Sequence, residues 1–543
     1  MAEHRDRVEV VIAGGGLAGL ATALELLDHG RDVLILERDR EDRLGGLAKR
    51  SFGGVMFVDT PHQRKLGIRD SPELALADWL SFADFGDGDR WPRRWAETYV
   101  ERVTPLVFDW LKARGVSFLP LVNWAERGLF RPGNSVPRWH IAWGTGFGIV
   151  EALTAALERH PRRDRLEIRC GRRVERLLVE AGQVVGCAGV LEEGGADFEV
   201  RAEHVVLASG GICGGDLGRV RREWYAPWGE PPATLLNGSH RFADGLLHDA
   251  AAAHGAALTH LDLQWHYAAG IRRREPEAAG EGISLVPPRS ALWLDARGRR
   301  FGPVPLMGYT DTRFLVETIC RTPWKYSWQV LNWRIAIREL AVSGSDYMTA
   351  FRHRRKLELV RQVLFGNPKL VRRLIEESED VVVADSLEEL MERMDELSLA
   401  GARLDRAGMA ADIRAYDDQI GRGSRYFNDD QLRRIAAFRS YRGDRIRTCR
   451  FQRIDEEKAR PLIAIREHIL SRKSLGGLMT DLEGRVLASR GEPIPGLYAV
   501  GETAGFGGGG IHGKGSLEGT FLGACVLTGR LAARSIAGAA AGG

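Results

Sequence analysis

The chain has 543 residues, of which 44% are hydrophobic and 28% charged, the proportions of a globular protein large enough for two domains. Its formal net charge is only +4, and its Lys and Arg residues are scattered along the chain, which argues against nucleic-acid binding. No apolar run approaches the roughly eighteen residues of a membrane-spanning helix, so we expect no membrane span.

The cysteines are widely spaced and include no C-x-x-C pair of the kind found in redox or metal sites. Reduced thiols of this kind are typical of a cytoplasmic protein. The first predicted strand begins near Val8, which leaves no room for a secretion signal. We therefore expect a cytoplasmic protein without a metal centre. The cysteines are Cys170, Cys187, Cys213, Cys320, Cys449 and Cys525.

The N-terminal segment predicts a strand, a helix and a second strand. Residues Val8–Ala13 are an apolar run, Leu17–His29 are rich in Ala and Leu, and Asp32–Glu37 are again apolar. This order implies a parallel sheet covered by helices. A later apolar run, Val205–Gly211, ends in a glycine pair and predicts a further strand of this kind.

The turn between the first strand and the helix reads G-x-G-x-x-G. Gly14 permits the tight turn, Gly16 lets the backbone approach a pyrophosphate, and Gly19 lets the helix pack closely on the strand. The helix start adds free N–H groups and the positive end of a dipole. Glu37, at the end of the next strand, is placed to accept hydrogen bonds from a ribose. These features together predict a dinucleotide site.

Two more glycine-rich segments suit the same ligand. Gly45–Gly54 follows the second strand, where a flavoprotein wraps the pyrophosphate and the flavin edge; taken alone, it is equally typical of a surface loop. Ala208–Gly211 ends a strand, and alone it is typical of any tight turn.

The middle of the chain has a different pattern. Residues 324–439 are rich in Arg and Glu and poor in glycine, which predicts mostly helices. Ser386 and Glu389 have the spacing of a capping box at the start of one of them. The outline is a glycine-rich α/β domain interrupted by a more helical insertion.

The C-terminal segment Gly496–Glu502 predicts a strand, and the glycine run Gly505–Gly510 and a helix over residues 517–533 follow it. Consecutive glycines weaken backbone order, and a linker would not lead at once into an ordered helix. A helix start at residues 515–518 would stabilise the negative charge of a reduced flavin. Glu502 is placed to hold the ribityl chain. A cofactor that reaches both ends of the chain is needed, and we predict FAD.

Together these segments resemble the flavoprotein family of fumarate reductases, succinate dehydrogenase flavoprotein subunits and 3-ketosteroid Δ1-dehydrogenases. The resemblance covers nearly the whole chain. It is carried by L-A-S-G-G (207–211), S-L-G-G-L-M-T-D-L-E-G-R-V-L (474–487), I-P-G-L-Y-A-V-G-E (494–502) and L-E-G-T-F-L-G (517–523). A bacterial branch of FAD-binding dehydrogenases is more similar still and shares W-A-E-R-G (124–128) and N-S-V-P-R-W-H (134–140).

The resemblance implies a Rossmann-like α/β FAD-binding domain, with a parallel sheet, built from residues 1–262 and 471–543. An α+β capping domain over residues 263–470 interrupts it and closes substrate over the flavin. The covalent flavin type uses a histidine in the loop after the second strand; residues 45–54 contain none and His62 has a different context, so we expect non-covalent FAD. The expected cofactor contacts are Gly14, Gly16, Leu17, Ala18, Gly19, Glu37, Arg38, Gly45, Gly46, Leu47, Ala48, Ser51, Gly53, Gly54, Ala208, Ser209, Gly210, Gly211, Asp244, Gly501, Glu502, Gly513, Ser516 and Leu517.

The catalytic positions follow from the same resemblance. His266 stands where the family's Q-x-H-P histidine contacts the substrate, although a purely structural histidine is the alternative. Tyr267 replaces the family proline, and its hydroxyl is a candidate acid or base. Arg313 is a weak candidate for the family's proton-donating arginine and is equally typical of a surface ion pair. His512 or Lys514 is placed to polarise a carbonyl, or simply to contact the flavin or a neighbouring carbonyl.

Two positions argue against a dicarboxylate substrate. Fumarate reductases grip it with a histidine and an arginine, and the matching positions here are Lys473 and Ser516. Loss of the second cation would leave one carboxylate poorly paired in a dry pocket. A ketosteroid is not established either, because Lys514 stands where the steroid dehydrogenases have a tyrosine. Trp139, Trp143 and Trp265 near the predicted pocket suit a flat, apolar substrate.

The predicted reaction is dehydrogenation, or its reverse, of a carbon–carbon bond next to a carbonyl, with hydride transfer to or from flavin N5. An FAD-dependent monooxygenase is one alternative, for which Asp244 in a D-G pair is the nearest motif match. A non-redox, flavin-dependent cyclase or binding protein is the other. No second nucleotide fingerprint is visible, so we expect a small-molecule substrate and an external electron partner: a quinone, a carrier protein or oxygen.

Overall fold

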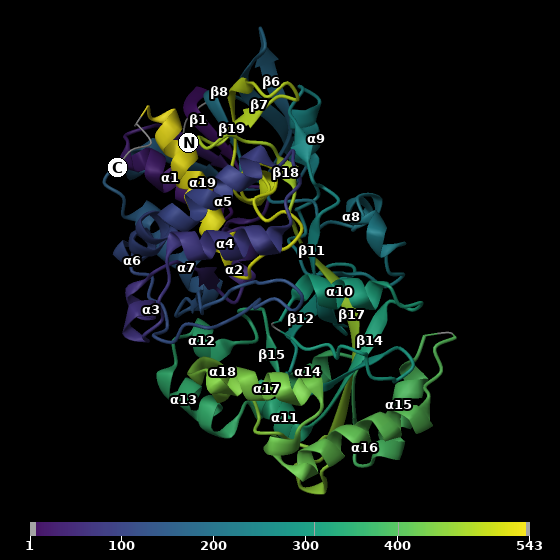
Figure 1. Cartoon of the computed structure of the whole chain (residues 1–543). Helices are drawn as coiled ribbons and strands as arrows, with labels where there is room; N and C mark the ends of the chain where they lie inside the picture. Colours follow the sequence, from purple (N-terminus) through teal and green to yellow (C-terminus); the bar gives the residue numbers. More distant parts are fainter. Residues whose placement is uncertain (1–6, 309, 400, 539–543) are drawn as a thin grey trace.

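The computed structural model describes residues 7–308, 310–399 and 401–538. It has two lobes, each built on its own eight-stranded sheet (Figure 1). In the described residues, no helix is both long and apolar enough to cross a membrane. The predicted fold class, an α/β domain with a parallel sheet and a second domain, is confirmed.

The first lobe contains the predicted β-α-β unit, which is therefore confirmed. Its central strands pair in parallel because helices connect them. In spatial order the strands are β19 (Arg485–Leu487), β20 (Pro493–Ala499), β8 (Asp197–Leu207), β1 (Arg7–Ala13), β2 (Val33–Leu36) and β5 (Leu166–Arg169), with β6 (Arg172–Glu180) and β7 (Gln183–Leu191) as an antiparallel extension.

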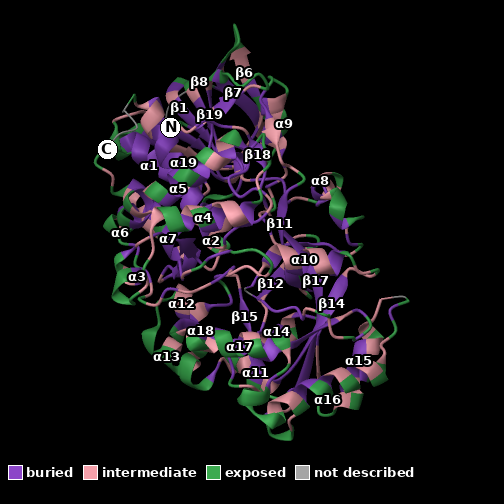
Figure 2. Cartoon of the chain, viewed as in Figure 1, coloured by how far each residue is buried: buried purple, intermediate pink, exposed green. Residues whose placement is uncertain are grey.

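Helices cover one face of this sheet and bury a large apolar cluster beneath them (Figure 2). Helix α1 packs along the C-terminal helix α19, so the two ends of the chain meet in one layer. The helices of this layer are α1 (Leu17–Asp28), α4 (Pro72–Ala83), α5 (Arg90–Val103), α7 (Thr145–Glu158) and α19 (Thr520–Ile536).

The second lobe holds a mainly antiparallel sheet. Its central strand β17 pairs with β11 and β14 and continues toward the first lobe (Figure 1). The expected boundary at 470/471 falls inside β17. The strands are β13 (Leu292–Asp295), β14 (Tyr326–Asn332), β17 (Leu462–Ser474), β11 (Gln264–Arg272), β12 (Gly282–Val286) and β15 (Ala341–Val342), joined by β16 (Val381–Ala384) and β9 (Leu236–Asn237).

The predicted helical insertion is mostly helical, but β14, β15 and β16 lie within it. Strand β14 was missed although Y-S-W-Q-V (326–330) alternates apolar and polar residues, because the prediction of helices rested on the composition of the whole region. The Ser386 hydroxyl accepts from the Glu389 N–H as predicted, whereas the Glu389 carboxylate accepts from the Asp385 N–H. The helices of the whole second lobe are α10 (Thr312–Cys320), α11 (Trp333–Glu339), α12 (Thr349–Arg352), α13 (Lys356–Phe365), α14 (Pro368–Glu377), α15 (Leu387–Leu397), α16 (Arg406–Arg422), α17 (Asp430–Ser440) and α18 (Arg442–Ile446).

Candidate active site

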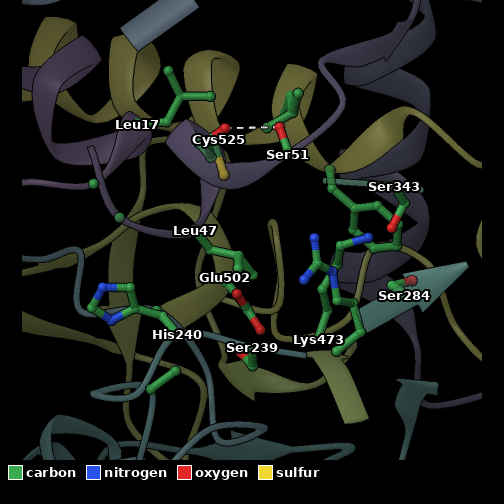
Figure 3. A pocket seen from close by; sticks show the side chains of 18 of the residues that line it. Leu17, Leu47, Ser51, Ser239, His240, Ser284, Ser343, Lys473, Glu502 and Cys525 are labelled. Atoms are coloured by element: carbon green, nitrogen blue, oxygen red, sulfur yellow. Dashed lines mark hydrogen bonds between the residues drawn. The ribbon is translucent and has the colours of Figure 1, made fainter. Parts of the chain in front are cut away.

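A deep cavity runs between the two lobes and holds about 2140 Å³ of empty space, open solvent at its mouth included. Its lining extends from the dinucleotide loop of the first lobe to strands β11 and β12 of the second. Figure 3 shows side chains of both lobes facing the same space: Leu17 and Ser51 from the first, Ser284 and Ser343 from the second.

The dinucleotide loop forms the floor of one end of this cavity. Gly14 has a φ of +117°, and a Cβ there would lie 2.3 Å from the Ala208 carbonyl oxygen. At Gly19 a Cβ would lie 2.1 Å from the Gly14 carbonyl oxygen. A Cβ on Gly16, by contrast, would have no described atom within 4 Å. Gly14 and Gly19 therefore serve close packing, and Gly16 keeps the space before the α1 N-terminus open, as a bound pyrophosphate requires.

Glu37 joins this loop to the second strand. Its carboxylate accepts from the Gly15 N–H at 2.6 Å and the Asp39 N–H at 2.7 Å, and the side chain lines the cavity. Two oxygens with several acceptor positions can also receive ribose hydroxyls. Arg38 pairs with Glu192 and, at 2.7 Å, with Asp244. These contacts hold the carboxylates and the guanidinium at the cavity edge, where the adenosine half of FAD would fit.

The loop Gly45–Gly54 closes over the same end. Gly53 has a φ of +81°, and a Cβ there would lie 2.4 Å from the Gly146 nitrogen. A Cβ at Gly54 would lie 2.0 Å from the Trp139 ring. The two glycines thus let the loop pack directly on α7 and on the indole of Trp139, which lines the cavity.

The strand end Ala208–Gly211 contributes Ala208, Ser209 and Gly210 to the cavity. Gly211 lies behind them, because a Cβ there would meet the Ser474 hydroxyl at 1.9 Å and the Glu502 carboxylate at 2.4 Å. Glu502 accepts from the Ser474 N–H at 2.9 Å. Burial raises the pKa of Glu502 to about 7. In Figure 3 the Glu502 side chain points into the cavity, beside Lys473.

The glycines of the C-terminal run Gly505–Gly510 lie outside the cavity lining, although Phe506 within the run reaches it. Gly507 and Gly508 have positive φ values, and Cβ atoms there would clash with Trp95 and with the Trp91 backbone. These glycines therefore allow a tight turn beneath α5. Helix α19 begins at Thr520, two residues later than the last position expected for the helix start.

Only part of this segment reaches the cavity. Glu518, Gly519 and Phe506 line it. Gly501, Gly513, Ser516 and Leu517 lie behind the lining, and the Ser516 hydroxyl bonds with the Thr520 hydroxyl at 3.1 Å. The helix N-terminus still faces the cavity, but through Glu518 and Gly519.

Beyond this end, Tyr267, Lys473 and Glu518 form a hydrogen-bonded cluster. The Tyr267 hydroxyl lies 3.1 Å from each Glu518 carboxylate oxygen, and Lys473 Nζ donates to Tyr267 Oη at 3.1 Å. The Trp265 indole N–H also approaches Glu518, at 3.4 Å. Lys473 Nζ sits 3.7 Å from the centre of the Phe521 ring. All three cluster members line the cavity.

Burial sets the proton affinities of this cluster. Burial lowers the pKa of Lys473 to about 8, although the nearby Glu518 carboxylate acts to raise it. Burial, with Glu518 beside it, raises the pKa of Tyr267 well above its ordinary value. At neutral pH the tyrosine is therefore a hydroxyl donor and the lysine an ammonium donor.

His266 occupies the opposite face of β11, because successive strand residues point to opposite sides. Its ring stacks on Trp224 with centroids 4.9 Å apart, and neither ring nitrogen has a hydrogen-bond partner among the described residues. Burial lowers the pKa of His266 to about 3. The residue lies outside the cavity lining, which matches the structural alternative.

The other three expected catalytic residues also lie outside the lining. Arg313 donates to the Lys514 carbonyl oxygen at 2.5 Å and stacks over Tyr225, and it has no ion pair among the described residues. Lys514 pairs with Asp84 at 3.0 Å at the surface. His512 is fully buried and bonds with the Thr520 hydroxyl at 2.7 Å.

Glu126 is a cavity residue that sequence reasoning missed. It is buried, has a φ of +50° and accepts from the Thr312 N–H at 2.9 Å and from its hydroxyl. Burial, with Asp311 nearby, raises the pKa of Glu126 to about 8. A strained backbone and a shifted carboxyl are common at functional sites. The W-A-E-R-G segment marked its position without revealing a role.

Both lobes contribute to a mostly apolar wall of the cavity, while Arg472, near the end of β17, donates to the Gly238 carbonyl oxygen. The ring of Phe52 stacks on Trp139 with centroids 5.9 Å apart. A broad apolar wall beside one polar cluster suits a flat substrate with a single polar end. The wall comprises Phe52, Trp139, Ala268, Ala269, Leu285, Val286, Pro287, Leu315, Ala341 and Val342.

The family model for the FAD binding domain matches residues 9–522. A KsdD-like steroid dehydrogenase of Mycolicibacterium smegmatis is 44% identical over 534 residues, which cover 95% of this chain and 96% of that protein.

Two solved structures share the fold. The 3-ketosteroid delta1-dehydrogenase of Sterolibacterium denitrificans has a TM-score of 0.71 at 16% identity, covering 99% of this chain and 100% of its own. A flavocytochrome c3 fumarate reductase has a TM-score of 0.68 at 20% identity, covering 99% and 79%. The resemblance drawn from the motifs and the prediction of FAD are confirmed.

Proposed function

The chain belongs to the FAD-binding-domain family and is an FAD-dependent dehydrogenase that acts on a carbon–carbon bond next to a carbonyl; from this premise, we propose that its substrate is a steroid ketone. One observation carries the proposal: the Tyr267–Lys473–Glu518 cluster faces a broad apolar wall in the cavity that also contains the dinucleotide loop. The steroid dehydrogenase of M. smegmatis, 44% identical, supports the same substrate class.

The cluster performs the proton chemistry. When bound, FAD supplies an acceptor for the hydride that leaves the substrate β-carbon. Lys473 places N–H donors where a ketone oxygen can accept them, which stabilises negative charge on that oxygen. Tyr267 Oη then takes the α-proton as its own hydroxyl proton passes to Glu518, so no free tyrosinate is formed.

We assign the cofactor contacts to the expected residues that line the cavity, and leave Gly19, Gly211, Gly501, Gly513, Ser516 and Leu517 as supports behind it. FAD is bound without a covalent link. The contacts are Gly14, Gly16, Leu17, Ala18, Glu37, Arg38, Gly45, Gly46, Leu47, Ala48, Ser51, Gly53, Gly54, Ala208, Ser209, Gly210, Asp244 and Glu502.

We further propose a cytoplasmic enzyme whose electrons leave to an external acceptor: a quinone, a carrier protein or oxygen. Six free cysteines, four of them buried, suit a reducing compartment. Steady-state turnover with each acceptor class in turn, at one steroid concentration, would identify the acceptor by the largest kcat/KM.

Anaerobic mixing tests the substrate. The FAD-loaded protein is mixed with 3-ketosteroids of different saturation, with simple cyclic ketones and with succinate, while the oxidised-flavin absorbance is followed. We expect a steroid ketone to bleach the flavin and to lose two hydrogens by mass spectrometry, and succinate to leave it oxidised. A flavin that stays oxidised with every ketone would contradict the proposal. Steroid-stimulated oxygen uptake with NADPH would indicate a monooxygenase, and turnover without bleaching a cyclase.

A further inference from the structure

Helix α13 (Lys356–Phe365) exposes apolar side chains that a globular surface normally buries. Leu357 is 88% exposed, Phe365 72%, Leu364 60% and Val360 55%. None of the ten residues of the helix is buried, and Figure 2 shows α13 at the outer edge of the second lobe, coloured largely as exposed. A contiguous apolar patch of this kind marks an interaction surface.

The spacing of these residues forms one continuous stripe. Leu357, Val360 and Leu364 are three and four positions apart, so they share one face of the helix. The opposite side contacts the protein: Glu358, Leu359 and Gln362 are only partly exposed, and α13 packs against α11. The helix is thus fixed on its scaffold with its apolar face turned outward.

Positive charges surround the stripe. Lys356 and Arg361 lie within the helix, and the exposed cations on either side are Arg354, Arg355, Lys369 and Arg372. The one acidic side chain of the helix, Glu358, is partly buried and pairs with Arg355 at 3.4 Å. A two-fold dimer through this face would bring the two sets of cations together, which like-charge repulsion opposes.

We propose that α13 docks on an anionic phospholipid surface. The apolar stripe would lie at the boundary of headgroups and acyl chains, while Lys356 and Arg361 extend their charged ends toward the lipid phosphates. The combination of a wide apolar face and a basic rim on a short helix fits this occupant in both shape and charge.

The surface is connected to the cavity through the preceding helix. Phe351 of α12 packs on Phe52 with ring centroids 5.2 Å apart, and Phe52 lines the cavity. Arg354 Nε also donates to the Trp143 carbonyl oxygen at 3.1 Å. Docking through α13 would therefore place the wall of the cavity close to a membrane, where apolar ketones dissolve. The inference does not depend on the identity of the substrate.

Vesicle flotation tests the proposal. The FAD-loaded protein is mixed with vesicles of phosphatidylcholine alone and with vesicles containing phosphatidylglycerol. We expect flotation with the anionic vesicles and its weakening at high salt. Leu357→Gln/Leu364→Gln and Lys356→Gln/Arg361→Gln should each reduce binding at least about tenfold. Tyr426→Gln, which changes a side chain that is 70% exposed elsewhere, should bind as the wild type does.

Turnover of a ketone in detergent-free buffer provides the folding control, and the surface variants should match the wild type there. Absence of flotation with anionic vesicles would overturn the proposal. So would sedimentation showing a dimer that Leu357→Gln/Leu364→Gln dissociates, because the face would then be a contact between copies. Vesicle binding is measured without substrate, so its failure is distinct from failure of the proposed reaction.

Discussion

Tyr267 and Lys473 meet inside the cavity with Oη and Nζ 3.1 Å apart, and the tyrosine hydroxyl also lies 3.1 Å from both carboxylate oxygens of Glu518. The first two residues come from β11 and β17, and Glu518 lies two residues before α19. Pairing of β11 with β17 fixes the first two, because Trp265 is paired with Lys473 and Tyr267 with Leu470. The proposed proton relay therefore lies at the junction of the two lobes.

Removal of the Tyr267 hydroxyl should stop the proton transfer but not cofactor binding. Tyr267→Phe keeps the ring that packs beside Lys473, and we expect kcat to fall about 100- to 10,000-fold. Anaerobic stopped-flow measurement of flavin reduction would show this loss, and the flavin spectrum would show full occupancy. A variant that reduces its flavin at the wild-type rate would remove Tyr267 from the mechanism.

Titration of Lys473 should give activity an alkaline limb. Burial lowers the pKa of Lys473 to about 8, so its ammonium is lost as the pH rises through that value. If this charge stabilises the enolate oxygen, kcat/KM falls above about pH 8, approaching tenfold per pH unit. Lys473→Arg should move the limb upward because a guanidinium stays charged. An alkaline limb that is the same in both proteins would contradict this assignment.

Most of the cofactor contacts expected from the sequence line the cavity, because their glycines are needed locally for turns and close approach. The sequence placed the substrate half of the site less well. The family resemblance favoured His266 as the substrate ligand, yet the cavity is lined by its neighbour Tyr267. Successive residues of a strand point to opposite faces, so these two side chains do not both reach the cavity. Glu126 and Glu518 were missed because only the folded chain brings residues 126, 267, 473 and 518 together.

Replacement of His266, whose ring stacks on Trp224, should change the stability of the protein rather than its activity. Both ring nitrogens are buried without partners among the described residues, which is unfavourable by about 1–3 kcal/mol. His266→Leu should therefore keep kcat within about threefold and raise the free energy of unfolding by about 1 kcal/mol. Turnover and urea unfolding measure the two effects. A loss of activity as large as that of Tyr267→Phe would restore His266 as the substrate ligand.

Gly16 allows the cofactor site to be tested without disturbing the fold. Its φ of −71° suits alanine, and a Cβ there would meet no described atom within 4 Å. Gly16→Ala should fold normally and lose FAD affinity at least about tenfold, since its methyl group would occupy space beside the pyrophosphate. Fluorescence titration of the apoprotein measures this. Gly88→Ala, also free of described neighbours, is the matched control and should bind FAD normally.

Glu126 should make stability depend on pH. Burial raises the pKa of Glu126 to about 8 from 4.5, so between these values the folded chain holds a proton that the unfolded chain releases. The stabilising contribution is therefore complete below about pH 4.5 and is lost as the pH rises through about 8, with a slope of up to about 1.4 kcal/mol per pH unit. The side chain of Glu126→Gln cannot titrate. The urea concentration at its unfolding midpoint should therefore rise relative to that of the wild type as the pH increases. Urea unfolding of both FAD-loaded proteins across this range measures the difference, and a pH-independent difference would show that Glu126 is ionised in the folded protein throughout.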